Sequence, residues 1–180
     1  RAGEFLKITG PNGVGKTTLL RIVCGLLPAE SGSVHWRGKV VRSTNDDFHL
    51  EMVYLGHLNS LKADLTAREN LQFLAGLRQT LTEADIDGAL DRVGILSRGA
   101  LPARSLSAGQ KRRLALARLL LSGATLWVLD EPVTNLDTAG IQLVEDLIVQ
   151  HVEQGGMAIA AAHQRLLDDA PCLRRLELEP

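Results

Sequence analysis

Short apolar runs recur along the chain and predict the strands of a buried sheet. The runs are Phe5–Thr9, Met52–Leu55, 126–129 and Met157–Ala161, followed by a last edge strand at 173–178. Residues 126–129 are apolar at every position, which is typical of a parallel strand covered on both faces. The pattern therefore predicts a sheet with parallel strands at its centre.

Longer segments with one apolar face predict helices between these strands. The helices are predicted to begin at residue 18, Thr66, Thr82, Ser107 and Thr138. Glu69 follows Thr66 at the spacing of a capping box, which supports that helix start. Residues 34–41 read as a hairpin around Gly38, and residues 43–47 as a loop. Alternating strands and helices predict an α/β fold with a layered core.

Composition narrows the range of partners. The 180 residues are 45% hydrophobic and 23% charged, with a formal net charge of -1, which gives no electrostatic basis for binding nucleic acid. No apolar run reaches the length of a membrane-spanning helix, so a membrane role is expected through a partner. Cys24 and Cys172 are interpreted as structural thiols of a reducing compartment. Lys111, Arg112 and Arg113 are assigned to a solvated helix face.

A phosphate-binding loop is predicted between the first strand and the first helix. It consists of Gly10, Pro11, Asn12, Gly13, Val14, Gly15, Lys16, Thr17 and Thr18, which fit G-x-x-x-x-G-K-[ST]. The backbone N–H groups of such a loop and the start of the helix converge on phosphates. Lys16 supplies a positive charge near the β- and γ-phosphates, and Thr17 a hydroxyl for Mg²⁺. A glycine-rich turn of no function is disfavoured because strand and helix are both present.

Two acidic residues follow the buried run at 126–129. Ligands of parallel α/β sheets bind beyond the carboxyl ends of the strands, so Asp130 and Glu131 are expected near the phosphate-binding loop. Asp130 would hold Mg²⁺, directly or through water, and Glu131 would act as general base on the attacking water. The alternative is a polar strand end before the turn at Pro132.

A third motif, LSAGQ at residues 106–110, begins a helix. Ser107 is a good N-cap, and the small residues after it predict either a second anion site or a simple capped helix. The order of GPNGVGKTT, LSAGQ, LWVLDEP, NLD and His163 resembles the ATP-binding cassette (ABC) family, whose signature is LSGGQ. The resemblance implies a P-loop NTPase (RecA-like) sheet core with a helical insert at about 62–105, in one ABC nucleotide-binding domain spanning 1–180.

The resemblance also implies an ATPase that works as a dimer of ATP-binding domains, with ATP and Mg²⁺. Ser107, Gly109 and Gln110 would then reach the γ-phosphate bound by the partner subunit, and Asp137 would connect the two sites. His163 would touch the γ-phosphate and the attacking water, which makes it a catalytic candidate beside Glu131. Without the resemblance, a histidine at a strand end would read as a structural residue.

Two departures from the family pattern stand out. The family has a glutamine just after the strand Met52–Leu55, where this chain reads GHLNS; either His57 or Asn59 could take its place. The chain also begins nine residues before Gly10, without the strands and the adenine-stacking aromatic of the family. The resemblance therefore implies an N-terminal truncation, which removes a contact of about 1 kcal/mol.

Local strings resemble the ATP-binding subunits of the haem exporters of cytochrome c maturation. They include Gly56-His57 before Lys62, KRRLALARL after the signature, and the run from Ala124 to Trp127. This resemblance implies a transporter subunit at the cytoplasmic face of the inner membrane, docked on membrane-spanning subunits through residues 56–65. On physical grounds Trp127 is simply a core aromatic.

Other readings remain open at this stage. They are the ATPase of another ABC export system, a soluble ABC ATPase acting on DNA or ribosomes, and an ATP-gated module with little turnover. The second is disfavoured because the chain has no coiled-coil insert, tandem cassette or basic arm. Intact Lys16, Asp130, Glu131 and His163 favour hydrolysis over the third. The cargo is not encoded here, since specificity lies largely in the membrane subunits.

Overall fold

A parallel sheet forms the centre of the protein. The computed structural model describes residues 1–179, and its five-stranded sheet has the order β4-β5-β6-β1-β7 with every pair parallel. The strands are β1 (Phe5–Thr9), β4 (Met52–Leu55), β5 (Leu126–Asp130), β6 (Met157–Ala161) and β7 (Leu173–Glu177). β5 is buried along its whole length, and β7 lies at an edge. The predicted α/β class and strands are confirmed.

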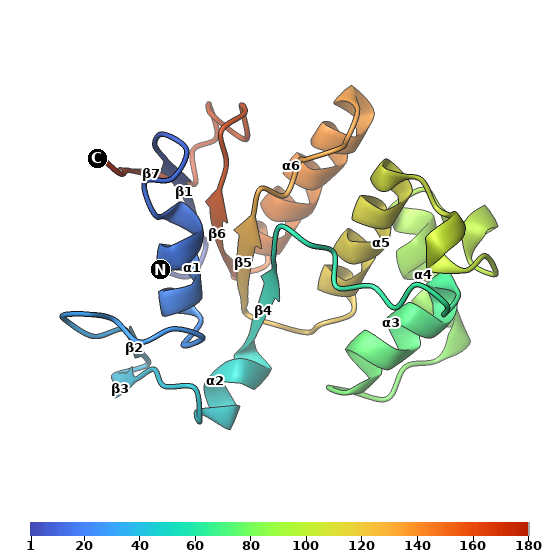
Figure 1. Cartoon of the computed structure of the whole chain (residues 1–180), viewed down its shortest axis with the longest axis horizontal. Coiled ribbons are helices and arrows are strands. Elements are labelled where there is room, and N and C mark those ends of the chain that lie inside the picture. The colour runs from blue at the N-terminus through green and yellow to red at the C-terminus, as the bar shows by residue number, and fades with distance from the viewer. Residues whose placement is uncertain (180) are drawn as a thin grey trace.

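Helices cover both faces of this sheet (Figure 1). α1 (Lys16–Val23) packs on one face with Leu126 and Val128 of β5. α5 (Ala108–Leu120) and α6 (Thr138–Glu153) pack on the other, with Trp127 and Leu129. This division follows from the alternation of side chains along a strand. No helix within residues 1–179 has both the length and the apolar character needed to cross a membrane.

A helical unit lies between β4 and α5 in the sequence and packs against α5. It contains α3 (Ala67–Gly76) and α4 (Glu83–Arg92), with 3₁₀ turns at Leu96–Arg98 and Ala103–Ser105. Both helices begin with a complete capping box, from Thr66 with Glu69 and from Thr82 with Asp85. In Figure 1 the unit lies on the far side of α5 from α1.

The segment before β4 differs from the sequence-based expectation. The predicted hairpin is present as β2 (His35–Trp36) paired antiparallel with β3 (Lys39–Val40). The predicted loop at 43–47 is wrong in its second half, because α2 (Asp46–Glu51) begins there. Phe48 anchors this helix: it is buried, and its ring lies 5.6 Å from that of Trp36. Hydrogen bonds from the Arg78 guanidinium to the carbonyl oxygens of His49 and Leu50 add to this contact. Partners that are distant in the sequence therefore order a segment whose polar residues indicate a loop.

The assignment of three basic residues to a solvated helix face is also wrong. Arg112 of α5 is only 2% exposed, and Lys111 and Arg113 are half-buried. Arg112 can be buried because its guanidinium meets hydrogen-bond acceptors from two other segments, as described below. A buried charge is tolerated when it is hydrogen-bonded in this way.

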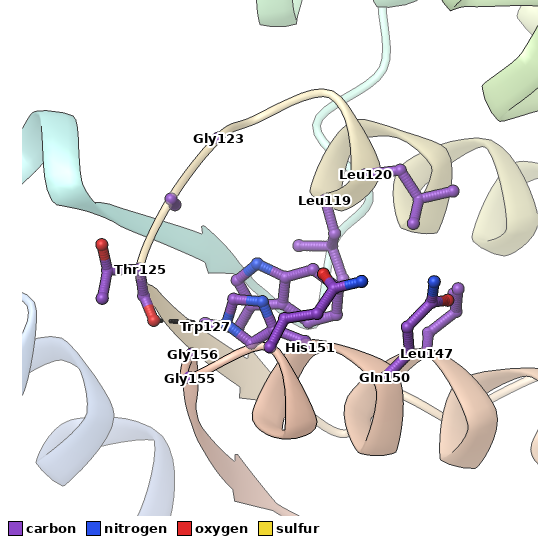
Figure 2. Close-up of a pocket in the computed structure, with 12 residues that line it drawn as sticks. Leu119, Leu120, Gly123, Thr125, Trp127, Leu147, Gln150, His151, Gly155 and Gly156 are labelled. Atoms are coloured by element: carbon purple, nitrogen blue, oxygen red, sulfur yellow. Dashed lines mark hydrogen bonds between the residues drawn. The ribbon is translucent and has the colours of Figure 1, made fainter. Parts of the chain in front are cut away.

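Trp127 stacks on His151 at the end of the sheet opposite the carboxyl ends of the strands (Figure 2). The two rings are 4.0 Å apart and 8° from parallel. His151 Nε2 lies 3.2 Å from the carbonyl oxygen of Thr125, which can only accept, so Nε2 carries the proton. Both rings line a cavity of about 380 Å³. Trp127 is 4% exposed, as expected of a core aromatic.

Candidate active site

The phosphate-binding loop, the acidic pair and His163 meet in one cavity of about 530 Å³. It lies beyond the carboxyl ends of the central strands, where parallel α/β sheets bind their ligands. Its lining consists of Asn12, Gly13, Gly15, Lys16, Thr17, Thr18, His57, Asp130, Glu131, Thr134, His163 and Gln164. Four segments that are far apart in the sequence therefore contribute to one site.

The loop between β1 and α1 has the backbone shape of a phosphate cradle. Gly13 and Gly15 have φ values of 82° and 106°, and a Cβ on either would meet nothing within 4 Å. Gly10 has φ 140°, and a Cβ there would come within 2.5 Å of the carbonyl oxygen of Leu178. Gly15 is the N-cap of α1 and receives no side-chain cap. The first N–H groups of α1 are therefore left for a ligand.

Lys16 brings a positive charge to this loop. Its side chain is buried along the helix start, with the whole residue 7% exposed. Nζ donates to the carbonyl oxygens of Gly10 at 2.8 Å and Pro11 at 2.9 Å. These bonds hold the ammonium group against the loop backbone, on the wall of the cavity that an anion would enter.

Thr17 and Asp130, the two residues predicted to hold Mg²⁺, lie in direct contact. Thr17 Oγ1 donates to the Asp130 carboxylate, 3.1 Å from Oδ1 and 3.0 Å from Oδ2. The Tyr54 hydroxyl donates to the same carboxylate at 3.4 Å. A hydroxyl and a carboxylate are the hard oxygen donors that Mg²⁺ prefers, so the residues fit this ion.

Tyr54 is a neighbour of the site that sequence reasoning missed. It belongs to β4, which pairs with β5 so that Tyr54 is opposite Val128. Burial raises the pKa of the Tyr54 hydroxyl, and the nearby Asp130 charge adds to that rise. The hydroxyl is therefore a proton donor at neutral pH and helps to orient the carboxylate. Only the strand order, which the sequence does not give, could have revealed this contact.

Glu131 and His163 face each other across the cavity. Glu131 Oε1 lies 3.5 Å from His163 Nε2, and the two residues follow the neighbouring strands β5 and β6. Glu131 has φ 49°, a left-handed conformation that is unfavourable for a residue with a side chain. Its N–H donates to the carbonyl oxygen of Ala161 at 2.9 Å, which helps to hold this conformation.

His57 and Asn59, the two alternatives for the missing glutamine, lie in different places. His57 lines the cavity, and Asn59 is not among the residues that do. Asn59 instead accepts a hydrogen bond from Arg112 at 3.0 Å, from Nη1 to Oδ1. Of the two, His57 therefore has the position from which a side chain can act on a bound nucleotide.

The LSAGQ motif starts α5 outside this cavity. Ser107 Oγ accepts from the N–H of Gln110 at 3.2 Å, and Gln110 Oε1 accepts from the N–H of Ser107 at 2.9 Å. The motif is thus a complete capping box. Gly109 sits against the next loop, since a Cβ there would lie 3.0 Å from the carbonyl oxygen of Asn135. Ser107 is exposed, so its face is open to a second subunit.

Asp137 also lies outside the cavity, as the N-cap of α6. Its Oδ1 accepts from the N–H of Gly140 at 2.8 Å and from Arg113 Nη2 at 3.2 Å. The Gly140 N–H and the Arg113 charge lower the pKa of this carboxyl. Since the side chain is 74% exposed, Asp137 presents a fixed negative charge on the surface next to α5, the signature helix that begins with LSAGQ.

Comparison with known proteins gives consistent likenesses. A model of the ABC transporter family matches residues 1–134. The chain is 44% identical to the cytochrome c biogenesis ATP-binding export protein CcmA of Vibrio vulnificus (strain YJ016), over 99% of this chain and 87% of that protein. It is 46% identical to CcmA of Vibrio cholerae, over 98% and 86%, and 45% identical to CcmA of Nitrosospira multiformis, over 98% and 86%.

Solved structures give the same picture of the fold. A putative ABC transporter ATP-binding protein from Pyrococcus furiosus superimposes with a TM-score of 0.84 and 25% identity, over 98% of this chain and 85% of that one. A dimeric ATP-binding cassette in a post-hydrolysis state with ADP and phosphate gives a TM-score of 0.81 at 23% identity, over 100% and 85%.

Proposed function

The chain belongs to the ABC transporter family, and we propose that it is the ATP-binding and ATP-hydrolysing subunit of the haem exporter of cytochrome c biogenesis. One observation carries the proposal: Lys16, Thr17, Asp130, Glu131 and His163 meet in a single cavity. Its similarity to the CcmA proteins of cytochrome c biogenesis indicates the biological process. On this proposal residues 1–180 form one ABC domain with a helical insert at about 62–105.

The first part of the mechanism is the binding of ATP and Mg²⁺. The free N–H groups at the start of α1 and the Lys16 ammonium would receive the phosphates. Thr17 and Asp130 would hold Mg²⁺ through their oxygen atoms. The ion, once bound, neutralises charge that develops on the phosphate oxygens. Tyr54 would keep the Asp130 carboxylate oriented through its hydrogen bond.

The second part is the attack of water on the γ-phosphate. Glu131 would accept a proton from the water while the oxygen of that water bonds to the γ-phosphorus. The bond between the γ-phosphorus and the oxygen of the departing ADP would break at the same step. His163, 3.5 Å from Glu131, would hold that carboxylate and contact the γ-phosphate. His57 lines the same cavity and would take the place of the family's glutamine.

The third part is assembly. Ser107, Gly109 and Gln110 belong to a helix start outside the chain's own cavity, which supports a role toward the nucleotide of a second ATP-binding domain. Asp137 would link the two sites, since it contacts Arg113 of the signature helix. The pair of domains would dock on membrane-spanning subunits at the cytoplasmic face of the inner membrane.

Steady-state ATP hydrolysis tests this function. It should be measured for the chain alone and with the membrane subunits of its own exporter, beside Lys16→Ala. We expect turnover that rises with the partners and vanishes in the variant, since the ammonium on the cavity wall is lost. Nucleotide binding without turnover in either setting would instead favour an ATP-gated module. Stimulation by an unrelated export system's membrane subunits alone would reassign the transporter.

A further inference from the structure

Arg112 is the most fully engaged polar side chain near the proposed catalytic groups. A guanidinium has five N–H donors in a planar fork. In Arg112 each of the five has an acceptor within 2.6 to 3.1 Å. The acceptors are the carbonyl oxygens of Asp130, Glu131, Pro132 and Gly56 and the side-chain oxygen of Asn59.

Burial makes this arrangement specific. Arg112 is 2% exposed, so no solvent replaces a lost acceptor. Burial lowers the pKa of Arg112 to about 10, while the charges of Asp130 and Glu131 act in the opposite direction. The group therefore stays charged at neutral pH. A charge at this depth holds its partners firmly, because separation would leave it unpaired.

The Arg112 guanidinium forms a hydrogen-bonded bridge between two segments, and one of them is the turn that carries Glu131. Arg112 Nη2 donates to the Glu131 carbonyl oxygen at 2.6 Å, and Nε to that of Pro132 at 3.0 Å. Glu131 has φ 49°, and such conformations persist only where the surroundings fix them. With the bond from the Glu131 N–H to Ala161, the Arg112 bonds fix the peptide on both sides.

The other end of the bridge is the loop that carries His57. Arg112 Nη1 donates to the carbonyl oxygen of Gly56 at 3.1 Å and to Asn59 Oδ1 at 3.0 Å. These two acceptors lie on either side of His57 in the sequence. One rigid guanidinium thus joins the loop after β4 to the turn after β5.

We propose that Arg112 is a positioning residue for ATP hydrolysis, which holds His57 and Glu131 in register by tying their two backbone segments together. The expected effect on ATP hydrolysis rests on the proposed function. The ordering of the two segments rests on the hydrogen bonds alone. This positioning role also explains why a charged residue occupies a buried position on α5. Any movement of the loop after β4 is passed directly to the turn that carries Glu131.

The chain contains a matched control. Arg78 also uses its guanidinium to bind backbone carbonyl oxygens, those of His49, Leu50 and Met52. Those acceptors lie at the end of α2 and the start of β4, at the opposite end of that strand from the cavity. Arg78→Met therefore removes a similar carbonyl clamp without touching the loop after β4 or the turn after β5.

The experiment compares Arg112→Met, Arg112→Lys and Arg78→Met in the full chain by two readouts. Hydrogen–deuterium exchange without nucleotide reads residues 56–61 and 130–136 directly. Steady-state kinetics reads kcat and KM for ATP with Mg²⁺. For Arg112→Met we expect faster exchange in both segments and kcat lower by about 10²-fold, with KM changed less than about threefold. For Arg78→Met we expect neither change.

Arg112→Lys distinguishes the effect of the five hydrogen bonds from the effect of the positive charge, because lysine keeps the charge but lacks the planar fork. We expect it to behave like Arg112→Met, and it carries the test if the methionine variant does not fold. Unchanged exchange in either segment, or kcat at the level of the unmodified chain in Arg112→Lys, would overturn the proposal. If the unmodified chain hydrolyses no ATP, the proposed function fails, and the exchange experiment still decides the bridge.

Discussion

Nε2 of His163 lies 3.5 Å from Oε1 of Glu131. The contact joins the ends of two neighbouring parallel strands, β5 and β6, and both side chains line the cavity that contains Lys16. His163 is therefore placed to steady the carboxylate that accepts a proton in the proposed mechanism. This geometry makes the role of Glu131 the first point to test.

Replacement of Glu131 by Gln should stop hydrolysis and leave nucleotide binding intact. The amide keeps the shape of the side chain but cannot accept a proton as the carboxylate does, so kcat should fall by about 10²–10³-fold. Because ATP persists, an ATP-bound dimer should accumulate, which light scattering during gel filtration detects. Glu83→Gln, at an exposed position of α4, is the control. Unmodified turnover in Glu131→Gln would remove Glu131 from the role of base.

The contact between Thr17 and Asp130 leads to a prediction about metal dependence. Thr17→Val removes the hydroxyl that lies 3.0 Å from Asp130 Oδ2 and conserves the shape of the side chain. We expect the gain in ADP affinity that Mg²⁺ gives to be about tenfold smaller in this variant than in the unmodified chain, since one ligand and its hydrogen bond are lost. Calorimetric titration with ADP, with and without Mg²⁺, measures this.

Thr17→Ser provides the matched control, because serine restores the oxygen atom. It should recover the Mg²⁺ dependence of ADP binding. Equal Mg²⁺ effects in Thr17→Val and the unmodified chain would show that Thr17 does not hold the ion, whatever happens to hydrolysis.

Asn70 is predicted to be a stability determinant of the loop before α3. It is fully buried, and its side chain both accepts from the N–H of Lys62 at 2.8 Å and donates to the carbonyl oxygens of Lys62, Leu65 and Thr66. Asn70→Leu leaves the N–H of Lys62 without its acceptor and removes the side-chain donor to the three carbonyl oxygens, which keep only their backbone donors. It should lower the free energy of unfolding by about 1–3 kcal/mol. Gln72→Leu, on the exposed side of the same helix, should change it by less than about 0.5 kcal/mol. Urea titration of both variants measures the difference, and equal stabilities would contradict the prediction.

Sequence patterns predicted most of the elements because their signals are local. The apolar run before Asp130, the cap at Ser107 and the glycines around Lys16 each depend on neighbours within a few residues. Those elements formed where the patterns indicated, except that α1 begins at Lys16, two residues before its predicted start. The rule that ligands bind beyond the carboxyl ends of parallel strands then predicted that Asp130 lies near the phosphate-binding loop, where it contacts Thr17.

The parts that sequence reasoning missed depend on contacts between distant segments. Arg112 follows a motif in a row of basic residues, and only the packing of α5 against two loops shows that it is buried. Tyr54 reaches Asp130 only because β4 is next to β5. α2 packs through Phe48 against Trp36 of the preceding hairpin, and Arg78 binds the carbonyl oxygens at its end. Helical spacing carries no information on any of these partners.

His151 should make the stability of the protein depend on pH. Burial lowers the pKa of its imidazole below the ordinary value of 6.5, and the hydrogen bond to Thr125 opposes that shift only in part. The folded protein therefore resists protonation at a pH where the unfolded chain already binds a proton. Stability should be unaffected by this group well above pH 6.5 and should be lost as the pH falls through that value towards the lower pKa of the folded state.

The variant His151→Gln isolates this contribution. Glutamine does not titrate and keeps a donor for the Thr125 carbonyl oxygen, although it gives up the stacking on Trp127. Its melting temperature should be lower than that of the unmodified chain at pH 8, yet should fall less between pH 8 and pH 5.5. His35→Gln, which removes an exposed histidine, should leave the pH dependence as it is. If the unmodified chain and His151→Gln lose the same number of degrees over this interval, the stacked imidazole is not the group that titrates.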